Sequence, residues 1–180
     1  MGFRSNSNLR RFGLKKSTKI VLVLFIFLIV AALPLYYYTR PETTQTDVLQ
    51  VKGKVNNPII LTIGQLKTQP STTVQVTLSS SSRPLDNGVY NYTGVQLPEL
   101  LAQANIFDSA SSIYIQASDG FGTTLSIQDA MNQNTIIAYR RNGLPLTALK
   151  DDGEGPLRLI IGSDQFAQRW VRGVVAIEVR

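Results

Sequence analysis

The side chains best equipped for chemistry in this sequence are hydroxyls, guanidinium groups and carboxylates, because its 180 residues include no histidine and no cysteine. Histidine is the usual general base near neutral pH, and cysteine supplies thiolate nucleophiles and soft metal ligands. Their absence excludes Ser-His-Asp and Cys-His catalytic sites, ordinary zinc sites and disulfide bonds. The chemistry that remains is that of oxygen ligands, ion pairs and hydrogen bonds.

Four residues are candidates for binding a ligand: Ser80, Arg83, Asp119 and Arg158. Ser80 belongs to the serine run at residues 79–82, and it faces either a pocket or, as we favour, the solvent at a strand end. Arg83 either holds a phosphate through its two-pronged guanidinium or lies on the surface beside a proline turn. Asp119 precedes a glycine and is first of all a turn residue. Arg158 interrupts an apolar run, so it either faces outward or is paired inside a pocket.

Two further charged segments favour structural roles. Residues 140–143 (Arg-Arg-Asn-Gly) predict a hairpin turn with two exposed cations. Residues 151–154 (Asp-Asp-Gly-Glu) offer oxygen ligands for a divalent cation but lack the spacing of an EF-hand, so we expect a solvated loop. Trp170, the only tryptophan, is expected to pack in the core.

Strands must position most of these residues. Residues 73–79 alternate strictly, with Val74, Val76 and Leu78 on one face, which is typical of a half-buried strand. Apolar runs predict further strands at residues 49–51, 59–63, 113–117, 136–139, 157–161 and 171–179.

Short helices are expected between the strands. Thr62 is placed to cap residues 63–67, Pro98 stands at the start of residues 99–104, and Ser126 precedes residues 127–132. Because strands and helices do not alternate regularly, the predicted fold class is α+β with a mixed or antiparallel sheet.

The residues before position 48 predict a membrane anchor. Residues 1–19 form a basic tail without acidic residues, and residues 20–38 are uncharged, mostly apolar and nearly long enough to cross the lipid bilayer as one helix. The positive-inside rule places the tail in the cytoplasm and the rest outside. Residues 39–47 are then a linker, and residues 48–180 form one extracytoplasmic domain. A cleaved signal peptide is the alternative, and it also exports the domain.

The net charge of +6 comes entirely from the basic tail. From residue 40 onward, 12 basic residues balance 12 acidic residues. A balanced domain has no general electrostatic attraction to phosphate backbones, so we expect no nucleic-acid partner.

Segments along nearly the whole domain follow one another in a recognisable order. They are residues 51–58 (VKGKVNNP), 76–78 (VTL), 92–101 (YTGVQLPELL), 118–121 (SDGF), 142–146 (NGLPL), 155–159 (GPLRL) and 170–174 (WVRGV). In order and spacing they resemble the molybdopterin-binding domain of the sulfite oxidase family. The resemblance implies a sulfite-oxidase-like fold with a mixed β-sheet and short helices, and molybdopterin as the ligand of the family.

The resemblance departs from the family at the metal site. The cysteine that ligates molybdenum in the family falls on Ser80, and the histidine usual before the strand at residues 157–161 is missing, with Glu154 nearby. A serine hydroxyl is far less acidic than a thiol and is a harder ligand. We therefore expect no catalysis of the family's kind and no bound metal or cofactor, although molybdopterin is the one cofactor that the resemblance leaves open.

Three functions follow from this combination of features. We favour a non-catalytic module, anchored in the membrane and displayed outside the cell, which binds a small ligand or a membrane protein partner. One alternative is a molybdopterin-dependent oxidoreductase that uses Ser80, or no protein ligand, on the metal. The other is an accessory subunit of a membrane redox complex, whose redox groups lie on partner chains.

Overall fold

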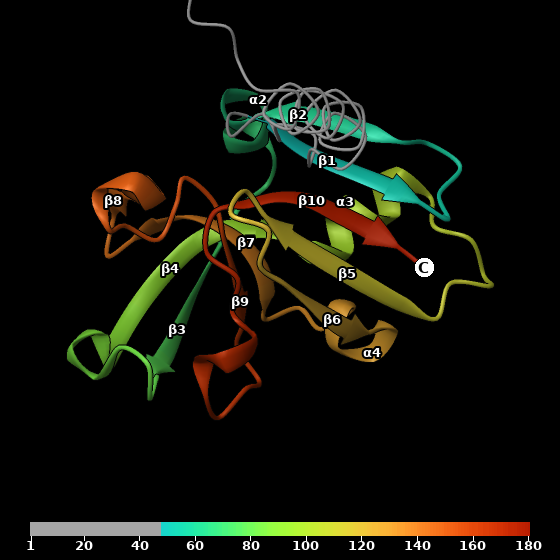
Figure 1. The fold of residues 1–180 in the computed structure, drawn as a ribbon. Coiled ribbons are helices and arrows are strands. Elements are labelled where there is room, and N and C mark those ends of the chain that lie inside the picture. The colour runs from blue at the N-terminus through green and yellow to red at the C-terminus, as the bar shows by residue number, and fades with distance from the viewer. Residues whose placement is uncertain (1–47) are drawn as a thin grey trace, which may run out of the picture. The chain divides into compact units, whose positions relative to one another are not determined.

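The computed structural model describes residues 48–180 of the chain (Figure 1). The basic tail, the membrane helix and the linker that the sequence predicts lie outside the described residues. Among the helices that the structure does describe, none is long and apolar enough to cross a membrane.

The first of two β-sheets has five strands in the order β2-β1-β10-β5-β6 (Figure 1). Its strands are β1 (Val48–Gly53), β2 (Ile59–Thr62), β5 (Ser112–Ala117), β6 (Gly122–Ser126) and β10 (Val174–Val179). β1 and β10 run parallel with Val51 opposite Ile177, whereas the other neighbours are antiparallel. β10 therefore lies between strands that come much earlier in the sequence.

The second sheet is antiparallel and contains β3, β4, β7 and β8, with β9 also paired to β7. Its strands are β3 (Thr72–Leu78), β4 (Gly88–Gln96), β7 (Thr135–Arg141), β8 (Leu144–Pro145) and β9 (Arg158–Ile161). On β3 the side chains of Val74, Val76 and Leu78 are buried and alternate with exposed ones, as predicted. The two sheets and their short helices confirm the expected α+β class with mixed strand directions.

The three predicted helices are present as α2 (Ile63–Thr68), α3 (Leu97–Ala104) and α4 (Ile127–Ala130). A capping box holds the start of α2, because Thr62 accepts a hydrogen bond from the Gln65 backbone while the Gln65 side chain accepts one from Thr62. The α4 helix begins after its Ser126 cap, as expected, but ends before residue 132. Three 3₁₀ turns, η1 (Pro84–Asp86), η2 (Leu149–Asp151) and η3 (Ala167–Arg169), complete the described elements.

The last strand is shorter than its apolar run predicts. β10 begins at Val174 and not at residue 171, because Gly173 adopts a positive φ of +64° and turns the chain. The residues before this turn pair with β9 instead, since Leu159 donates its backbone N–H to the Val171 carbonyl at 2.8 Å. The apolar run at residues 171–179 therefore contributes to both sheets, with Val171 beside β9 and residues 174–179 in β10.

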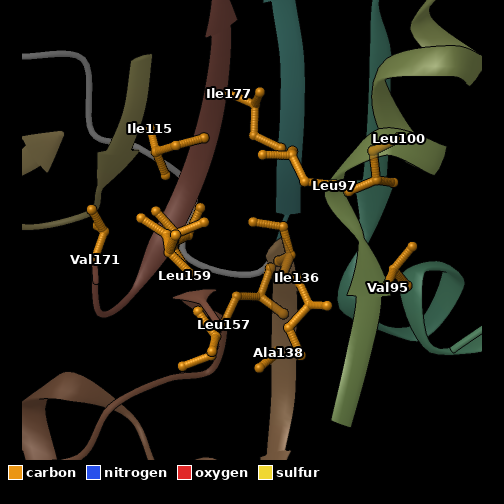
Figure 2. Close-up of a cluster of buried hydrophobic side chains, with 14 of the residues drawn as sticks. Val95, Leu97, Leu100, Ile115, Ile136, Ala138, Leu157, Leu159, Val171 and Ile177 are labelled. Atoms are coloured by element: carbon orange, nitrogen blue, oxygen red, sulfur yellow. The ribbon is translucent and has the colours of Figure 1, made fainter. Parts of the chain in front are cut away.

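The hydrophobic core draws on both sheets (Figure 2). Ile115 of β5 and Ile177 of β10 meet Ile136 of β7 and Leu159 of β9, and all four side chains are fully buried. Burying a side chain of this size stabilises the fold by about 1.5–3 kcal/mol. Every residue of β9 is buried, so Arg158, its first residue, is fixed at the boundary of the core.

Candidate functional site

A cavity of about 310 Å³ opens beside the ends of β3 and β9. Its lining includes all four sequence-predicted binding residues, Ser80, Arg83, Asp119 and Arg158. They come from the loop after β3, the turn between β5 and β6, and the start of β9. The fold thus brings the predicted residues together, in a volume at the lower end of the range for small-molecule pockets.

Hydroxyl groups form one wall of the cavity, in the loop that follows β3. The Ser80 backbone N–H donates to the Asn87 side-chain oxygen at 2.7 Å, and the Ser80 and Ser82 hydroxyls lie 3.1 Å apart. The Ala167 backbone N–H donates to the Ser79 carbonyl at 2.9 Å, which ties this loop to η3. Ser80 is half-buried, so the solvated strand end that we favoured describes its position only in part.

Arg83 binds carboxylates of the protein itself. Its guanidinium makes two hydrogen bonds to Asp152, at 2.8 and 3.1 Å, and a third to Asp86. Hydrogen bonding to Arg83 holds the pKa of the Asp152 carboxyl below its ordinary value. The two-pronged contact that the sequence offered to a phosphate is therefore made with an internal partner.

Asp119 makes the turn that the sequence predicts. Its carboxylate accepts a hydrogen bond from the Phe121 backbone N–H at 3.0 Å, and Gly120 between them has a φ of +88°. Glycine adopts this positive φ without the strain that the Cβ of another residue would cause against its own backbone. The turn places Asp119 on the cavity wall.

A buried ionic network lies behind the cavity and includes Arg158. Only 5% of Arg158 is exposed, and its Nη1 lies 2.7 Å from Glu154 Oε1. Arg141 Nη1 lies 2.5 Å from the same oxygen, and the Tyr92 hydroxyl donates to Glu154 Oε2 at 2.9 Å. Of the two positions expected for Arg158, the paired one inside a pocket is confirmed.

Glu154 and Arg141 correct two sequence-based expectations. Asp151 and Asp152 are exposed as expected, but Glu154 at the end of the acidic segment is only 8% exposed. The chain turns inward there, since Gly153 and Gly155 donate their N–H groups to the carbonyls of residues 148 and 147. Arg141, expected as an exposed cation in the hairpin, is half-buried because Glu154 draws it inward.

The electrostatics of the network keep Tyr92 protonated and Arg141 charged. Burial raises the pKa of Tyr92, an effect that Arg158 opposes and Glu154 reinforces. Burial lowers the pKa of Arg141, but the combined effect of the Glu154 carboxylate and the neighbouring tyrosines is larger, and the net pKa is raised. Tyr92 therefore donates its proton to Glu154 as a hydrogen bond and does not transfer it.

Two buried donors on residues that line the cavity have no hydrogen-bond partner in the described part of the chain. They are Arg158 Nε and Trp170 Nε1. The Trp170 ring meets Tyr92 edge to face at 6.4 Å, and Arg158 Cζ lies 5.6 Å from each of these rings. Trp170 is 4% exposed, which confirms its expected place in the core. An unsatisfied buried donor costs about 1–3 kcal/mol, so these two groups reduce the stability of the fold.

A second cavity, of about 320 Å³, adjoins the first and shares Arg83 and Asp86 with it. Its walls include Tyr90, Arg141 and Glu154. The ion pair between Arg83 and Asp152 thus lies at the boundary of the two spaces.

The donor set of the cavity suits an organic ligand better than a molybdenum ion. Hydroxyl, guanidinium and indole groups are hydrogen-bond donors, whereas a thiolate, the soft ligand that molybdenum prefers, is absent from the whole sequence. Among residues 48–180, no cluster of three acidic side chains is placed to hold a metal ion either. The residues therefore do not fit a thiolate-bound molybdenum centre, although they fit a heterocycle with several acceptors.

Two sheets around this cavity define a domain of the sulfite-oxidase-like, molybdopterin-binding class. The chain belongs to the family described as oxidoreductase molybdopterin binding domain, whose model matches residues 38–180. This membership confirms the resemblance that the sequence motifs carry.

Two known proteins illustrate the relationship. The chain is 27% identical over 130 residues to the uncharacterized oxidoreductase YuiH of Bacillus subtilis (strain 168), across 70% of this chain and 63% of that protein. The sulfane dehydrogenase SoxCD of Paracoccus pantotrophus shares the fold with a TM-score of 0.65 and 20% identity, across 75% of this chain and 39% of that chain. The chain thus spans less than two thirds of either protein.

Sequence reasoning did not find the second half of the site. Tyr92, Arg141 and Glu154 come from three separate segments, and Arg172 joins the cavity wall beside Trp170. The antiparallel pairing of β4 with β7 sets Tyr92 opposite Arg141, but these strands lie far apart in the sequence and no local pattern marks the pairing. Predicting it would have required predicting β4, whose glycine and asparagine residues are not typical of a strand.

Proposed function

We propose that this domain is a non-catalytic member of its family that binds a small ligand in the cavity between Ser80, Arg158 and Trp170. The convergence of Ser80, Arg83, Asp119 and Arg158 on one cavity carries the proposal. Two residues of the cavity wall, Arg158 and Trp170, also hold buried nitrogen donors that have no partner within residues 48–180. Membership of a molybdopterin-binding family supports a heterocyclic ligand. The hydroxyls of Ser80 and Ser82 and the side chains of Arg158 and Trp170, which line the cavity, are the groups that would hold it.

The serine at position 80 supports the non-catalytic part of the proposal. When bound, molybdopterin supplies two-electron redox chemistry at a molybdenum ion that its own sulfur atoms hold. In the family a cysteine thiolate completes that ligand set, whereas the Ser80 hydroxyl keeps its proton near neutral pH and hydrogen bonds with Ser82. The cavity then keeps hydrogen-bond donors for an organic molecule but lacks the thiolate that would bind the metal.

Metal and pterin analysis of the purified protein tests the proposal. We would purify the full chain from cells that make molybdopterin, beside the Ser80→Cys variant, which restores a thiolate at the cavity wall. The wild type should contain far less than one equivalent of molybdenum, and the variant should retain more. Stoichiometric molybdenum in the wild type would contradict the proposal.

An oxidoreductase is the second candidate, because the family and its Bacillus relative carry that name. In this case Ser80, or no protein side chain, would complete the coordination of molybdenum. Reduction of an artificial electron acceptor by the molybdenum-containing protein, lost in Ser80→Ala, would favour this candidate. The same activity in a metal-free preparation would count against it.

We also propose that residues 20–38 anchor the domain in the membrane with the domain outside the cytoplasm. The basic tail and the apolar run support this proposal. Resistance of the full chain to alkaline extraction from membranes, lost when residues 1–47 are deleted, is the expected result. Co-purification of a membrane protein in mild detergent would favour the accessory-subunit role, and a clean monomer would count against that role.

A further inference from the structure

The second sheet ends in an edge strand, β3, that lacks the usual protection against further pairing. β3 pairs with β4 from Thr72 to Leu78 without a bulge. Among residues 48–180, no backbone group bonds to β3 from its other side, and only beyond its end does the Ala167 N–H reach the Ser79 carbonyl. The strand contains no charged residue and no proline, two features with which natural proteins block an open edge.

The other described strands at sheet borders are short or covered. β2 has four residues, β6 has five and β8 has two, one of which is Pro145. β9 is covered on its outer side, since Leu159 donates its backbone N–H to the Val171 carbonyl at 2.8 Å. β3, with seven residues, is therefore the longest open edge of the two described sheets.

The sequence of β3 reads the same in both directions around its centre. Residues 73–77 are Thr-Val-Gln-Val-Thr, with Gln75 in the middle. When two copies of β3 lie antiparallel with their Gln75 residues opposite each other, every threonine of this segment faces a threonine and every valine faces a valine. Such threonine pairs and pairs of β-branched residues stabilise antiparallel sheets, and no like charges meet.

The same register pairs the backbone groups and aligns the faces of the two sheets. Alternate residues of a strand direct their N–H and C=O groups to the same side, so a two-fold axis through Gln75 brings the outward-facing residues of both copies opposite one another. Val74 and Val76 are buried on one face, whereas Thr73, Gln75 and Thr77 are exposed on the other. The exposed side chains of both copies then share one face of a continuous sheet.

We propose that this edge joins two copies of the chain, through antiparallel pairing of β3 with β3 of a second copy about a two-fold axis at Gln75. Because both copies contribute the same edge, the pair closes as a dimer and leaves no open β3 for a third copy. Pairing of one strand is at the small end of specific interfaces, so we expect a Kd of about 1–100 µM. The inference does not depend on the ligand-binding function proposed above.

Cysteine cross-linking of the full chain tests the register directly, because the sequence contains no cysteine. Single-cysteine variants are oxidised with copper–phenanthroline in the cells that produce them, and the products are identified by mass spectrometry. Gln75→Cys places its two thiols on directly opposed residues, whose Cβ atoms lie about 4.5–5.5 Å apart. Thr73→Cys places them four residues apart along the strands, a separation of at least about 13 Å.

Gln75→Cys should form a disulfide-linked dimer at least about tenfold faster than Thr73→Cys, since a paired strand holds the second thiol at a high effective concentration. Thr73→Cys and Thr77→Cys produced together should form a mixed dimer, because these two positions face each other in the proposed register. Thr124→Cys is the matched control, an exposed threonine on the edge strand β6 of the first sheet. It should give only the slow background reaction.

Three results would overturn the inference. The first is an equal rate for Gln75→Cys and Thr124→Cys. The second is a Thr73→Cys dimer that forms faster than the Gln75→Cys dimer, which indicates a different register. The third is a Gln75→Cys product that contains another protein and no second copy, which assigns the edge to a different partner.

Charge substitutions at the axis give an independent measurement. Gln75→Lys alone and Gln75→Glu alone place like charges opposite each other, so each should raise the Kd of the dimer about two- to fivefold. An equal mixture of the two variants pairs opposite charges and should restore the wild-type value. Sedimentation equilibrium of the full chain in mild detergent measures these constants. A wild type that stays monomeric at about 100 µM, or single variants that dimerise as tightly as the wild type, contradicts the proposed pairing.

Discussion

Replacing Glu154 by glutamine should lower the free energy of unfolding by about 3 kcal/mol. Breaking a buried ion pair from one side generally costs about 3–5 kcal/mol, because the remaining charge stays buried. Arg158, with 6% of its side chain exposed, cannot reach water when Glu154 loses its charge. Arg141 can reach water, since 37% of its side chain is exposed. The expected loss of stability therefore lies at the lower end of the range of about 3–5 kcal/mol.

Urea unfolding followed by fluorescence measures this loss, because Trp170 is the only tryptophan and is 4% exposed in the folded domain. A loss of this size also lowers the melting temperature by roughly 10–15 °C for a domain of this length. Glu178→Gln, at an exposed ion pair, should cost less than about 1 kcal/mol.

A double-mutant cycle with Arg158→Met separates the ion pair from general effects of the substitution. The double variant should be more stable than the sum of the two single losses predicts, by at least about 1 kcal/mol, because no unpaired charge remains between the two positions. Two results would refute the reasoning: a Glu154→Gln variant within about 0.5 kcal/mol of the wild type, or strictly additive losses.

Three other predictions concern the fold. Leu159→Ala should cost about 2–5 kcal/mol in urea unfolding because Leu159 is fully buried, whereas Leu144→Ala, at a side chain 70% exposed, should stay within about 0.5 kcal/mol; equal losses would contradict the core assignment. Thr62→Ala should cost about 1 kcal/mol by removing the α2 cap, and Thr62→Ser should restore most of it. Hydrogen bonding to Arg169 lowers the pKa of Asp129 from its ordinary 3.8, so Asp129 contributes stability that is present above this value and lost as the pH falls through the folded-state pKa. Asp129→Asn should therefore flatten the acid side of the stability curve, and an unchanged slope below about pH 4 would contradict this assignment.

Strands with strong apolar patterns were predictable from the sequence, whereas β4, β6 and β8, which lack such patterns, were not. β3 alternates and β9 is continuously apolar, so local pattern and final burial agree. β4 contains Gly88, Asn91 and Gly94, which disfavour strands, yet it pairs with β3 on one side and β7 on the other. A side chain at Gly94 would meet the Ile137 carbonyl at 2.2 Å, so close packing explains this glycine.

The residues of the candidate site also divide into those that a local sequence pattern marks and those that it does not. Ser80, Arg83, Asp119 and Arg158 were found because each stands beside a local signal: a serine run, a proline turn, an Asp-Gly pair or a charge in an apolar strand. Their convergence on one cavity depends on the fold, which the family resemblance supplied. Pairing between distant residues leaves no such local mark, and Glu154 therefore read as part of a solvated acidic loop.

The position of β10 in the middle of the first sheet has a consequence for how the domain folds during synthesis. During synthesis β1, β2, β5 and β6 leave the ribosome long before residues 174–179, yet β1 and β5 are joined only through β10. Without β10, strands β1 and β2 can pair only with each other, and so can β5 and β6, and closing the sheet joins strands distant in sequence, which slows folding. A nascent chain that stops short of Val174 should remain open to proteases and chaperones, and the addition of β10 should make the domain resistant.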